Sequence, residues 1–303
     1  MKNNLKILLM TPWMEMFLGS ETHFYALARA FQEMGFKVHI FTYLKDKMWD
    51  KMRETGARLL DDEIKDEYDL VIMNGNPCLS RAPRSAYKIF ISNGVLPPPE
   101  QPILGADKYV SISEEVQDSL RQKGYGSFLI RNGIDCERFK PTRQINKKLK
   151  NVLLLSNKQN PRTKEFIAIE EACKELKVNL ICCGLQFGTS VFETEEFINI
   201  SDLVISLGRG VYEAMATGRN VICADYQGMD GFIDEQTYLE ARKNNCSGRR
   251  FKMSITKETI IKELKKYNPS QGKKNRELIL KDQNIYDTAL DYLDIFNNQR
   301  LNV

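Results

Sequence analysis

The chain has 303 residues, of which 42% are hydrophobic and 28% are charged, and its formal net charge is +4. This length allows two domains with a core each, because single cores usually stop growing at roughly 250–300 residues. The composition excludes a disordered chain. No apolar run approaches the ~18 residues that span a bilayer, and the first one is too short for a signal peptide, so we interpret it as a strand.

The seven cysteines are odd in number, and most of them lie in apolar runs typical of strands or helices. Cys182 and Cys183 are neighbours, so they would point to opposite faces of a strand and form no CxxC pair. The chain has only two histidines, which makes a zinc site unexpected. We therefore expect free thiols, no metal site and a cytoplasmic, reducing location.

Short β-rich runs alternate with longer segments of helical period, which is typical of a parallel sheet covered by helices. In the first half the predicted strands are residues 6–9, 38–43, 70–73, 88–92, 109–112 and 128–130. After a polar stretch the pattern begins again, with strands at 152–155, 178–183, 203–206 and 221–224. The sequence therefore predicts an α/β fold with one Rossmann-like domain over residues 1–142 and a second over residues 150–270.

The end of the chain predicts a long amphipathic helix over residues 275–298. Ile285, Ala289, Leu293 and Phe296 fall on one stripe, which needs a partner surface. We expect this C-terminal segment, residues 275–303, to pack back on the N-terminal domain. Basic residues concentrate between positions 242 and 276. Such a run is usually a solvated face, but it also permits peripheral contact with a membrane or with a polyanion.

In open parallel sheets, ligands bind beyond the carboxyl ends of the strands. The first such loop ends in Gly19 and Ser20, immediately before a helix. A glycine there lets the backbone approach a ligand closely, although a capped turn explains the same residues. The GxGxxG pattern is absent from this loop, so a dinucleotide cofactor is not expected.

The second informative loop follows the strand at residues 203–206. Gly208, Arg209, Gly210 and Val211 lead into a helix, where amide groups and a guanidinium can converge on a diphosphate. Glu213 follows in the first helical turn. A carboxylate there either stabilises the helix through its dipole or accepts hydrogen bonds from a ribose, and the spacing alone leaves both readings open.

The sequence resembles the retaining GT-B glycosyltransferases of glycosyltransferase family 4. The resemblance lies in residues 19–42, which begin Gly19-Ser20-Glu21, in residues 110–114 with 131–141, and in residues 201–218, which include Glu213 and end in Gly218. It implies two Rossmann-like domains that face each other across a cleft. It also implies a nucleotide-diphosphate sugar as the donor, bound mainly by the C-terminal domain, with no separate cofactor and no metal.

The resemblance places Glu213 on the ribose of the donor and the Gly208 to Val211 turn near its diphosphate, with Gly19 also on the donor side. A positive pair after the first strand of the second domain neutralises the leaving diphosphate in this family. The candidates are Lys158, Arg162 and Lys164, whose spacing departs from the usual pattern; a solvated basic loop is the alternative. Preorganised positive groups of this kind can replace a metal ion. Retaining chemistry needs no protein nucleophile when the acceptor attacks from the same face.

The resemblance assigns the acceptor to the N-terminal domain, near Ser20, His23 and Asn74. Where the family often has a histidine, this chain has Asn93, and a neutral amide binds sugar hydroxyls but cannot act as a base. The family also has a Glu eight residues before the one that matches Glu213, and here that position is Ile205. The contact with the sugar that this Glu implies would be made by the backbone of Gly208 or by Arg209, or would be lost.

The expected function is transfer of a hexosyl or pentosyl group to an acceptor hydroxyl. A carbohydrate or cell-envelope glycan is favoured as acceptor over DNA. Three alternatives stay open: a GT-B binding or scaffold protein without catalysis, as Ile205 and Asn93 suggest, a nucleotide-sugar epimerase of the same architecture, and a transferase for a polyanionic acceptor such as modified DNA.

Overall fold

A computed structural model describes the backbone of residues 5–300 and the side chains of residues 5–298. The chain divides into two compact units. Unit 1 comprises Met1–Gly133 together with Ile285–Val303, and unit 2 comprises Ile134–Asn284. The predicted C-terminal segment extends to residue 303, and its last three positions lie outside the described residues.

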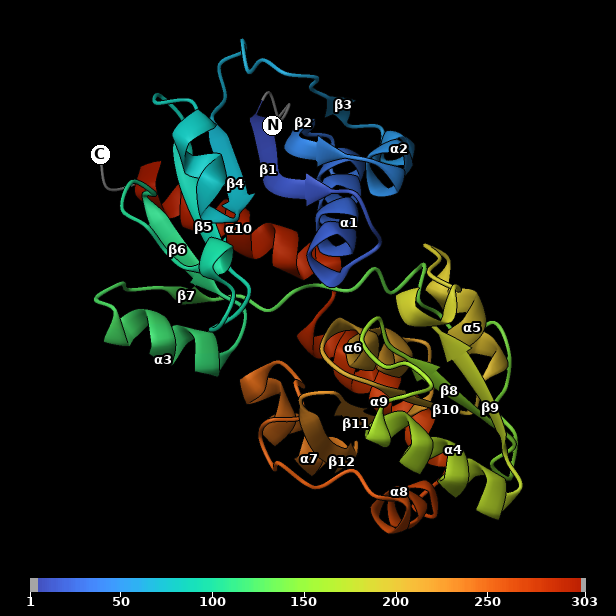
Figure 1. Ribbon diagram of the computed structural model, residues 1–303. Helices are drawn as coiled ribbons and strands as arrows, with labels where there is room; N and C mark the ends of the chain where they lie inside the picture. Colours follow the sequence, from blue (N-terminus) through green and yellow to red (C-terminus); the bar gives the residue numbers. More distant parts are fainter. Residues whose placement is uncertain (1–4, 301–303) are drawn as a thin grey trace. The chain divides into compact units, whose positions relative to one another are not determined.

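Unit 1 is built on a seven-stranded sheet in the order β3-β2-β1-β4-β5-β6-β7 (Figure 1). Every neighbouring pair in this sheet is parallel, so the carboxyl ends of its strands lie at one edge. The strands are β1 (Lys6–Met14), β2 (Lys37–Lys45), β3 (Arg58–Leu59), β4 (Leu70–Asn74), β5 (Tyr87–Ser92), β6 (Lys108–Ser111) and β7 (Phe128–Leu129). Only β3 was not predicted, because two residues carry no periodicity.

The helices of unit 1 come from both ends of the chain. They are α1 (Gly19–Glu33), α2 (Lys47–Met52), α3 (Glu114–Gln122) and α10 (Ile285–Arg300), with short 3-10 turns η1 (Arg53–Thr55), η2 (Asn76–Arg81) and η3 (Pro98–Glu100). Helix α10 packs against α1. The predicted apolar stripe of α10 is confirmed, since Ile285, Ala289, Leu293 and Phe296 are all buried. The Phe296 ring lies 5.8 Å from the ring of Tyr87 on β5.

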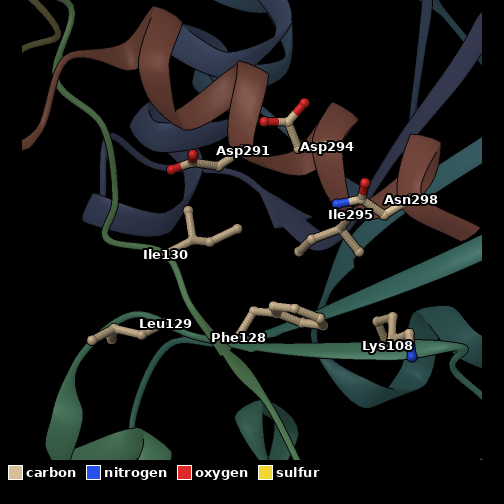
Figure 2. Close-up of a pocket in the computed structure, with 8 residues that line it drawn as sticks. All are labelled: Lys108, Phe128, Leu129, Ile130, Asp291, Asp294, Ile295 and Asn298. Atoms are coloured by element: carbon tan, nitrogen blue, oxygen red, sulfur yellow. The ribbon is translucent and has the colours of Figure 1, made fainter.

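A cavity of about 630 Å³ lies between the β6–β7 edge of this sheet and α10. Figure 2 shows its apolar lining, which includes Phe128 and Ile295, with Asp291 and Asp294 on the helix. Burial raises the pKa of Asp291, and the neighbouring Asp294 and Asp287 raise it further. None of the residues predicted to bind donor or acceptor lines this cavity.

Unit 2 is built on a five-stranded sheet in the order β12-β11-β10-β8-β9. Its strands are β8 (Asn151–Leu155), β9 (Asn179–Cys183), β10 (Leu203–Ser206), β11 (Asn220–Asp225) and β12 (Gly228–Phe232). All pairs are parallel except the antiparallel β11–β12 pair. Strand β12 was not predicted, because its sequence Gly-Met-Asp-Gly-Phe has two glycines and no clear alternation.

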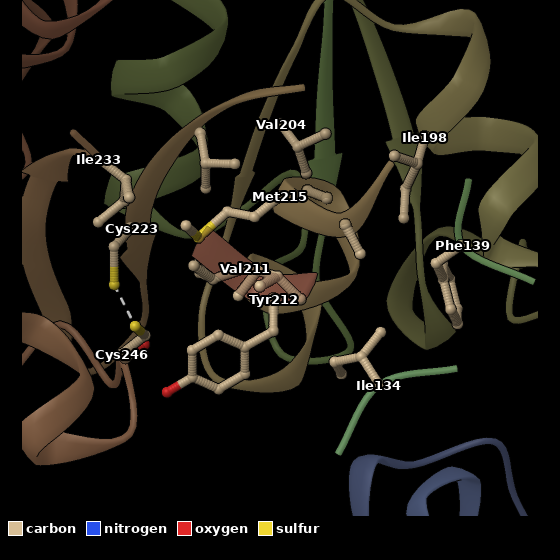
Figure 3. Packing of buried hydrophobic residues seen from close by; sticks show 14 of the residues in the cluster. Ile134, Phe139, Ile198, Val204, Val211, Tyr212, Met215, Cys223, Ile233 and Cys246 are labelled. Carbon is tan, nitrogen blue, oxygen red and sulfur yellow. Dashed lines mark hydrogen bonds between the residues drawn. The ribbon is translucent and has the colours of Figure 1, made fainter. Parts of the chain in front are cut away.

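The helices of unit 2 are α4 (Lys164–Leu176), α5 (Thr194–Ile200), α6 (Arg209–Ala216), α7 (Glu235–Ala241), α8 (Lys257–Leu264) and α9 (Pro269–Asp282), with the turns η4 (Leu185–Phe187) and η5 (Arg242–Asn244). One core of this unit gathers side chains from α6 and the central strands, including Val204, Val211 and Met215 (Figure 3). Ile134 and Phe139 belong to the same core. This packing explains why unit 2 begins at Ile134, before the predicted domain boundary at residues 142–150.

The prediction of one helix over residues 275–298 is wrong. Helix α9 ends at Asp282 in unit 2, and α10 begins at Ile285 in unit 1. Gln283 between them has an extended φ of −144°, and its carbonyl accepts a hydrogen bond of 2.7 Å from the Ile134 amide. This pairing breaks the helical ladder at the point where the chain leaves unit 2.

Every strand predicted from the sequence has a counterpart in the structure, and the predicted α/β class is confirmed. In the described part of the chain, no helix combines the length and the apolarity that crossing a membrane requires.

Candidate functional site

The predicted donor loop lies at the carboxyl edge of the unit 2 sheet. Strands β8 and β10 are parallel neighbours, so the loops that follow them share this edge. Only Leu207 and Gly208 separate β10 from α6. Gly208 has φ 57° and ψ −129°, a conformation that favours glycine. This sharp turn starts α6 at Arg209, directly at the edge of the sheet.

Arg209 and Glu213 form an ion pair across the first turn of α6. Arg209 Nε donates to Glu213 Oε1 at 2.8 Å, and the two side chains are 10% and 9% exposed. Burial raises the pKa of Glu213 and lowers that of Arg209, while the attraction between the two charges opposes both shifts. The pair is buried beside the exit of β10, where both groups were predicted to hold a donor.

Arg138 adds a second positive charge to this cluster. Its guanidinium lies 2.7 Å from Glu195 Oε2 and 3.8 Å from the centroid of the Phe192 ring. The Arg138 charge also opposes the rise in the pKa of Glu213. Arg138 was not predicted from the sequence, because it lies near the start of unit 2, far from α6 in the sequence, and no local pattern links the two.

The backbone amides of the loop are only partly open to a phosphate. The Gly208 amide donates to the Cys246 carbonyl at 2.8 Å, and the Val211 amide donates to the Gly208 carbonyl at 3.1 Å. The expectation that amides throughout this turn face a diphosphate is therefore corrected for Gly208 and Val211. The Gly210 amide makes no hydrogen bond with any described residue.

Gly210 is also required by packing. A Cβ at this position would lie 2.2 Å from Ser206 Oγ and 3.3 Å from Leu155 Cδ2. The glycine therefore allows α6 to begin against the ends of β8 and β10, which accounts for its presence without any ligand.

The predicted basic residues lie at the same edge of the sheet, in the loop after β8 and at the start of α4. Lys158 and Arg162 are exposed, and neither forms an ion pair within residues 5–298. The side chain of Lys164 is 90% exposed and lies 3.9 Å from Glu165. The structure thus brings these cations to the edge that carries Arg209, and their individual roles stay predictions.

A buried carboxylate that we did not predict anchors the basic loop. Asp225 at the end of β11 accepts a 2.8 Å hydrogen bond from Ser156 Oγ, and this hydroxyl in turn accepts the Lys158 and Gln159 amides at 3.1 and 3.0 Å. Burial raises the pKa of Asp225. An aspartate at the end of a strand is common, so the sequence held no signal for this arrangement.

Ile205 does not occupy a site position. It lies within β10, is 0% exposed and pairs with Leu154 and Ile222 of the neighbouring strands. A side chain there points into the core, so counting eight residues back from Glu213 does not reach a position that could face a sugar.

The site residues predicted in the N-terminal domain lie at the carboxyl edge of the unit 1 sheet. Gly19 and Ser20 open α1 after β1, Asn74 ends β4, and Asn93 follows β5, and these three strands are consecutive in the sheet. The side-chain oxygens of Asn74 and Asn93 are buried and accept no hydrogen bond from the described residues. A buried acceptor without a donor costs about 1–3 kcal/mol, which a ligand hydroxyl would offset.

His23 does not fit its predicted role. Its side chain is 1% exposed and meets the Phe24 ring edge-on at 6.2 Å. It therefore lines no open surface for an acceptor. His39, in β2, shares a 2.8 Å hydrogen bond with the Tyr68 hydroxyl.

Two glutamates at this edge were not recognised as site residues. Glu21 in the first turn of α1 is 3% exposed and accepts a 2.7 Å hydrogen bond from Ser20 Oγ. Glu100 lies against Gly94, where an added Cβ would be 2.6 Å from Glu100 Oε2. Burial raises the pKa of Glu100 to about 7, and the Glu21 charge contributes. The proline-rich turn before Glu100 gave no sign of this proximity.

Among residues 5–298, no group of three or more His, Cys, Asp or Glu side chains is arranged to hold a metal ion.

Comparison with solved structures finds the same fold over nearly the whole chain. HepE of Anabaena, in complex with UDP and glucose, superposes with a TM-score of 0.65 at 13% identity and covers 97% of this chain and 100% of its own. A substituted form of TarM from S. aureus, in complex with fondaparinux, α-GlcNAc-glycerol and UDP, gives 0.65 at 10% identity, with 97% and 100% covered. A UDP-N-acetylglucosamine 2-epimerase gives 0.57 at 12% identity, with 94% and 92% covered.

No protein-family model matches the sequence, and no curated protein sequence matches it. At these identities the structural likeness shows the fold, and the predicted GT-B fold of two Rossmann-like domains is confirmed. The finer assignment to glycosyltransferase family 4 stays a prediction.

Proposed function

We propose that this chain is a glycosyltransferase that moves a sugar from a nucleotide-diphosphate sugar to an acceptor hydroxyl. The observation that carries the proposal is the buried Arg209–Glu213 pair at the start of α6, on the same sheet edge as the exposed Lys158 and Arg162. The fold agrees with it, because HepE and TarM share this fold and are described in complex with UDP.

Glu213 is the proposed ribose ligand. Its Oε1 is engaged by Arg209, whereas its Oε2 accepts no hydrogen bond from the described residues. Ribose hydroxyls are donors that this second oxygen can accept, and Arg209 would keep the carboxylate ionised and oriented. The Gly210 amide and the guanidinium of Arg209 are the donors proposed to face the diphosphate.

Lys158, Arg162 and Lys164 are the proposed stabilisers of the leaving diphosphate. Cleavage of the sugar–phosphate bond places negative charge on that group, and cations fixed nearby lower the barrier. We propose that this charge stabilisation makes a metal ion unnecessary. We also propose retention of configuration, with the acceptor attacking on the face of the leaving phosphate and giving its proton to that phosphate.

The acceptor is proposed to bind at the unit 1 edge. The side-chain oxygens of Asn74 and Asn93, which are buried without a hydrogen-bond donor among the described residues, suit the hydroxyl groups of a carbohydrate. Ser20 hydrogen-bonds Glu21 and remains half-buried, so both can contact the same ligand. Gly19 is exposed at the start of α1, where a donor phosphate or sugar could approach the backbone.

A carbohydrate or cell-envelope acceptor is preferred to a polyanion such as DNA. Much of the basic segment is neutralised locally, since Arg242 pairs with Asp282 and both Lys243 and Arg250 pair with Glu240. Peripheral membrane contact through the remaining cations is part of the proposal. We also propose that the protein functions in a reducing, cytoplasmic compartment, where free thiols such as its cysteines persist.

A nucleotide-sugar epimerase is the second candidate, because a UDP-N-acetylglucosamine 2-epimerase shares the fold. An epimerase converts the donor without an acceptor, whereas a transferase needs one. A binding protein without catalysis would hold the donor and turn over nothing.

The deciding experiment is a thermal-shift screen with UDP-, GDP-, ADP- and CMP-sugars, followed by turnover assays on the sugar that stabilises the protein. A ligand at 100 times its Kd stabilises the native state by about 2.7 kcal/mol. Stabilisation with acceptor-dependent release of the nucleotide supports the transferase. Turnover of the donor alone favours the epimerase. If none of the four sugars stabilises the protein, both assignments are overturned.

A further inference from the structure

Unit 2 contains a positively charged cavity at the edge of its sheet opposite the proposed donor site. Helix α6 starts at the carboxyl edge and runs back to Gly218, and Arg219 then precedes β11, which starts at Asn220. A cavity of about 510 Å³ is found here. Its lining includes Arg143, Arg219, Lys273 and Arg276, and no acidic residue lines it.

Arg219 is the most deeply placed of these cations, with 1% of its side chain exposed. Its Nε donates to the Ile198 carbonyl at 3.2 Å, and its Nη2 donates to the Arg143 and Asn199 carbonyls at 2.9 and 3.0 Å. Its Nη1 makes no hydrogen bond with any residue that the structure describes. Neutral carbonyls thus orient the guanidinium without cancelling its charge, which leaves a buried cation with an open donor.

No carboxylate forms an ion pair with Arg219 among the described residues. Asp202 attracts it from farther away. Both Asp202 oxygens are already occupied, because Oδ1 accepts the Asn146 amide at 2.9 Å and Oδ2 accepts the Lys150 and Asn151 amides at 3.0 and 2.9 Å. Burial lowers the pKa of Arg219 to about 10, as is expected for a cation without a contacting anion.

Arg276 is held in the same manner. Its Nη1 donates to the Phe139 carbonyl at 3.0 Å and also to the Ala216 carbonyl, and its Nη2 donates to Cys136 at 3.3 Å. It pairs with no carboxylate in the described part of the chain. Arg143 is exposed without an ion pair there, and Lys273 meets only the exposed Glu277, at 3.8 Å. Cations gathered in this way repel one another unless an anion binds between them.

Close backbone packing builds the wall of the cavity. A Cβ on Gly272 in α9 would lie 2.1 Å from the Gly218 carbonyl oxygen, so α9 and the end of α6 are in direct contact. The Asn275 side chain fixes this contact by donating to the Arg219 carbonyl at 2.9 Å. Pro269, the first residue of α9, also lines the cavity, and the positive end of a helix dipole favours an anion.

We propose that this cavity binds the phosphate group of a small phosphorylated ligand, as a site separate from the proposed donor site. Arginine donors match phosphate oxygens in geometry and charge, and several cations around one site suit an anion with more than one negative charge. The volume exceeds that of a phosphate and falls within the range of ligand pockets, so an organic group fits beside Pro141 and Ile145. The proposal does not depend on the glycosyltransferase assignment.

The test is calorimetric titration of the full chain with inorganic pyrophosphate as the probe. Arg143→Ala with Lys273→Ala removes two exposed cations from the cavity and leaves the carbonyl-bonded arginines in place. Lys158→Ala with Arg162→Ala is the control at the opposite edge of the sheet, and the cavity variant is made in this control background so that the proposed donor edge does not supply its binding. We expect the wild type and the control to bind pyrophosphate, and the cavity variant to bind it at least about tenfold more weakly than the control, with an unchanged melting temperature.

The proposal is overturned if the wild type does not bind pyrophosphate, or if the cavity variant binds it as tightly as the control. It is also overturned if binding disappears in the control, because the donor edge would then account for all of it. Loss of nucleotide-sugar binding in the control with retained pyrophosphate binding would support both sites independently.

Discussion

Arg209 and Glu213 lie one turn apart on α6, and their 2.8 Å ion pair is almost completely removed from solvent. The sequence suggested that Arg209 binds the diphosphate and Glu213 the ribose, as two independent ligands. The structure couples them, since each is the main charged partner of the other. Removal of either one leaves the other buried without its main charged partner, so stability and donor binding must be measured separately.

Glu213→Ala is expected to destabilise the protein by about 3–5 kcal/mol, because Arg209 would stay buried without its main charged partner. It should also abolish binding, in a calorimetric titration, of the nucleotide sugar that stabilises the wild type in the thermal-shift screen. The double variant Arg209→Met with Glu213→Leu replaces both charges by apolar groups and should recover most of the stability in urea unfolding. An affinity for that nucleotide sugar equal to the wild type in the double variant would show that neither group contacts the nucleotide.

Lys158→Ala with Arg162→Ala is expected to lower the rate of sugar transfer by about 100-fold or more, because the leaving diphosphate loses donors for its developing charge. Both side chains are exposed, so the melting temperature should stay unchanged. Exposed Lys177, at the far end of α4, provides the control as Lys177→Gln. Equal rates for the double variant and this control would remove the basic loop from the reaction.

The pKa of Glu100, raised to about 7 from an ordinary 4.5, predicts a pH-dependent stability. Burial disfavours the ionised form, so the contribution of this group is most favourable below pH 4.5 and is lost as the pH rises through about 7. Glu100→Gln stays neutral at every pH. It should therefore raise the melting temperature at about pH 8.5 by roughly 2–4 °C, corresponding to about 1 kcal/mol, and change it little at about pH 5.

The control for this pH experiment is Glu67→Gln, which alters an exposed carboxylate. It should leave the melting temperature the same at both pH values. A Glu100→Gln variant that is equally stable relative to wild type at both pH values would mean that the carboxyl is solvated, contrary to its position against Gly94.

The sequence predicted what depends on local periodicity. Short apolar runs predicted every strand except β3 and β12, and the stripe of α10 predicted which of its faces is buried. Glycines placed the turn after β10 correctly. The interruption between helices α9 and α10 at Gln283 was not predicted. It depends on a hydrogen bond from the Ile134 amide, which is distant in sequence, and no local pattern reveals this pairing.

The residues of the candidate site stay predictions, and the hydrogen bonds and ion pairs among them were missed for the same reason. Arg209 and Glu213 were identified as site residues, but their ion pair was not, and the engagement of the Gly208 amide by Cys246 depends on a loop far along the chain. Glu100 and Asp225 acquire raised pKa values from burial, which only the folded chain defines. Residue types in a sequence can indicate which residues form a site. Hydrogen-bond partners and desolvation in the folded chain decide which of their polar groups remain available to a ligand.

Gly184→Ala tests whether the basic loop is held by backbone packing. Gly184 follows β9 with φ +148°, and an added Cβ would lie 1.8 Å from the Ser156 carbonyl oxygen. Because the obstacle is backbone, the Ser156 loop must shift, and we expect a loss of about 2 kcal/mol or more in urea unfolding. The displacement should also weaken donor binding, since Ser156 supports the Lys158 amide.

Gly188→Ala provides the matched comparison, because Gly188 ends the same turn with φ +69° but has nothing within 4 Å of an added Cβ. Its cost is limited to the left-handed conformation, about 1 kcal/mol, and it should leave donor affinity unchanged. If Gly184→Ala were no more destabilising than Gly188→Ala, and bound the donor as well, close packing against Ser156 could not be what positions the basic loop. A larger loss of stability and of donor affinity for Gly184→Ala would instead show that the position of Lys158 depends on this backbone contact.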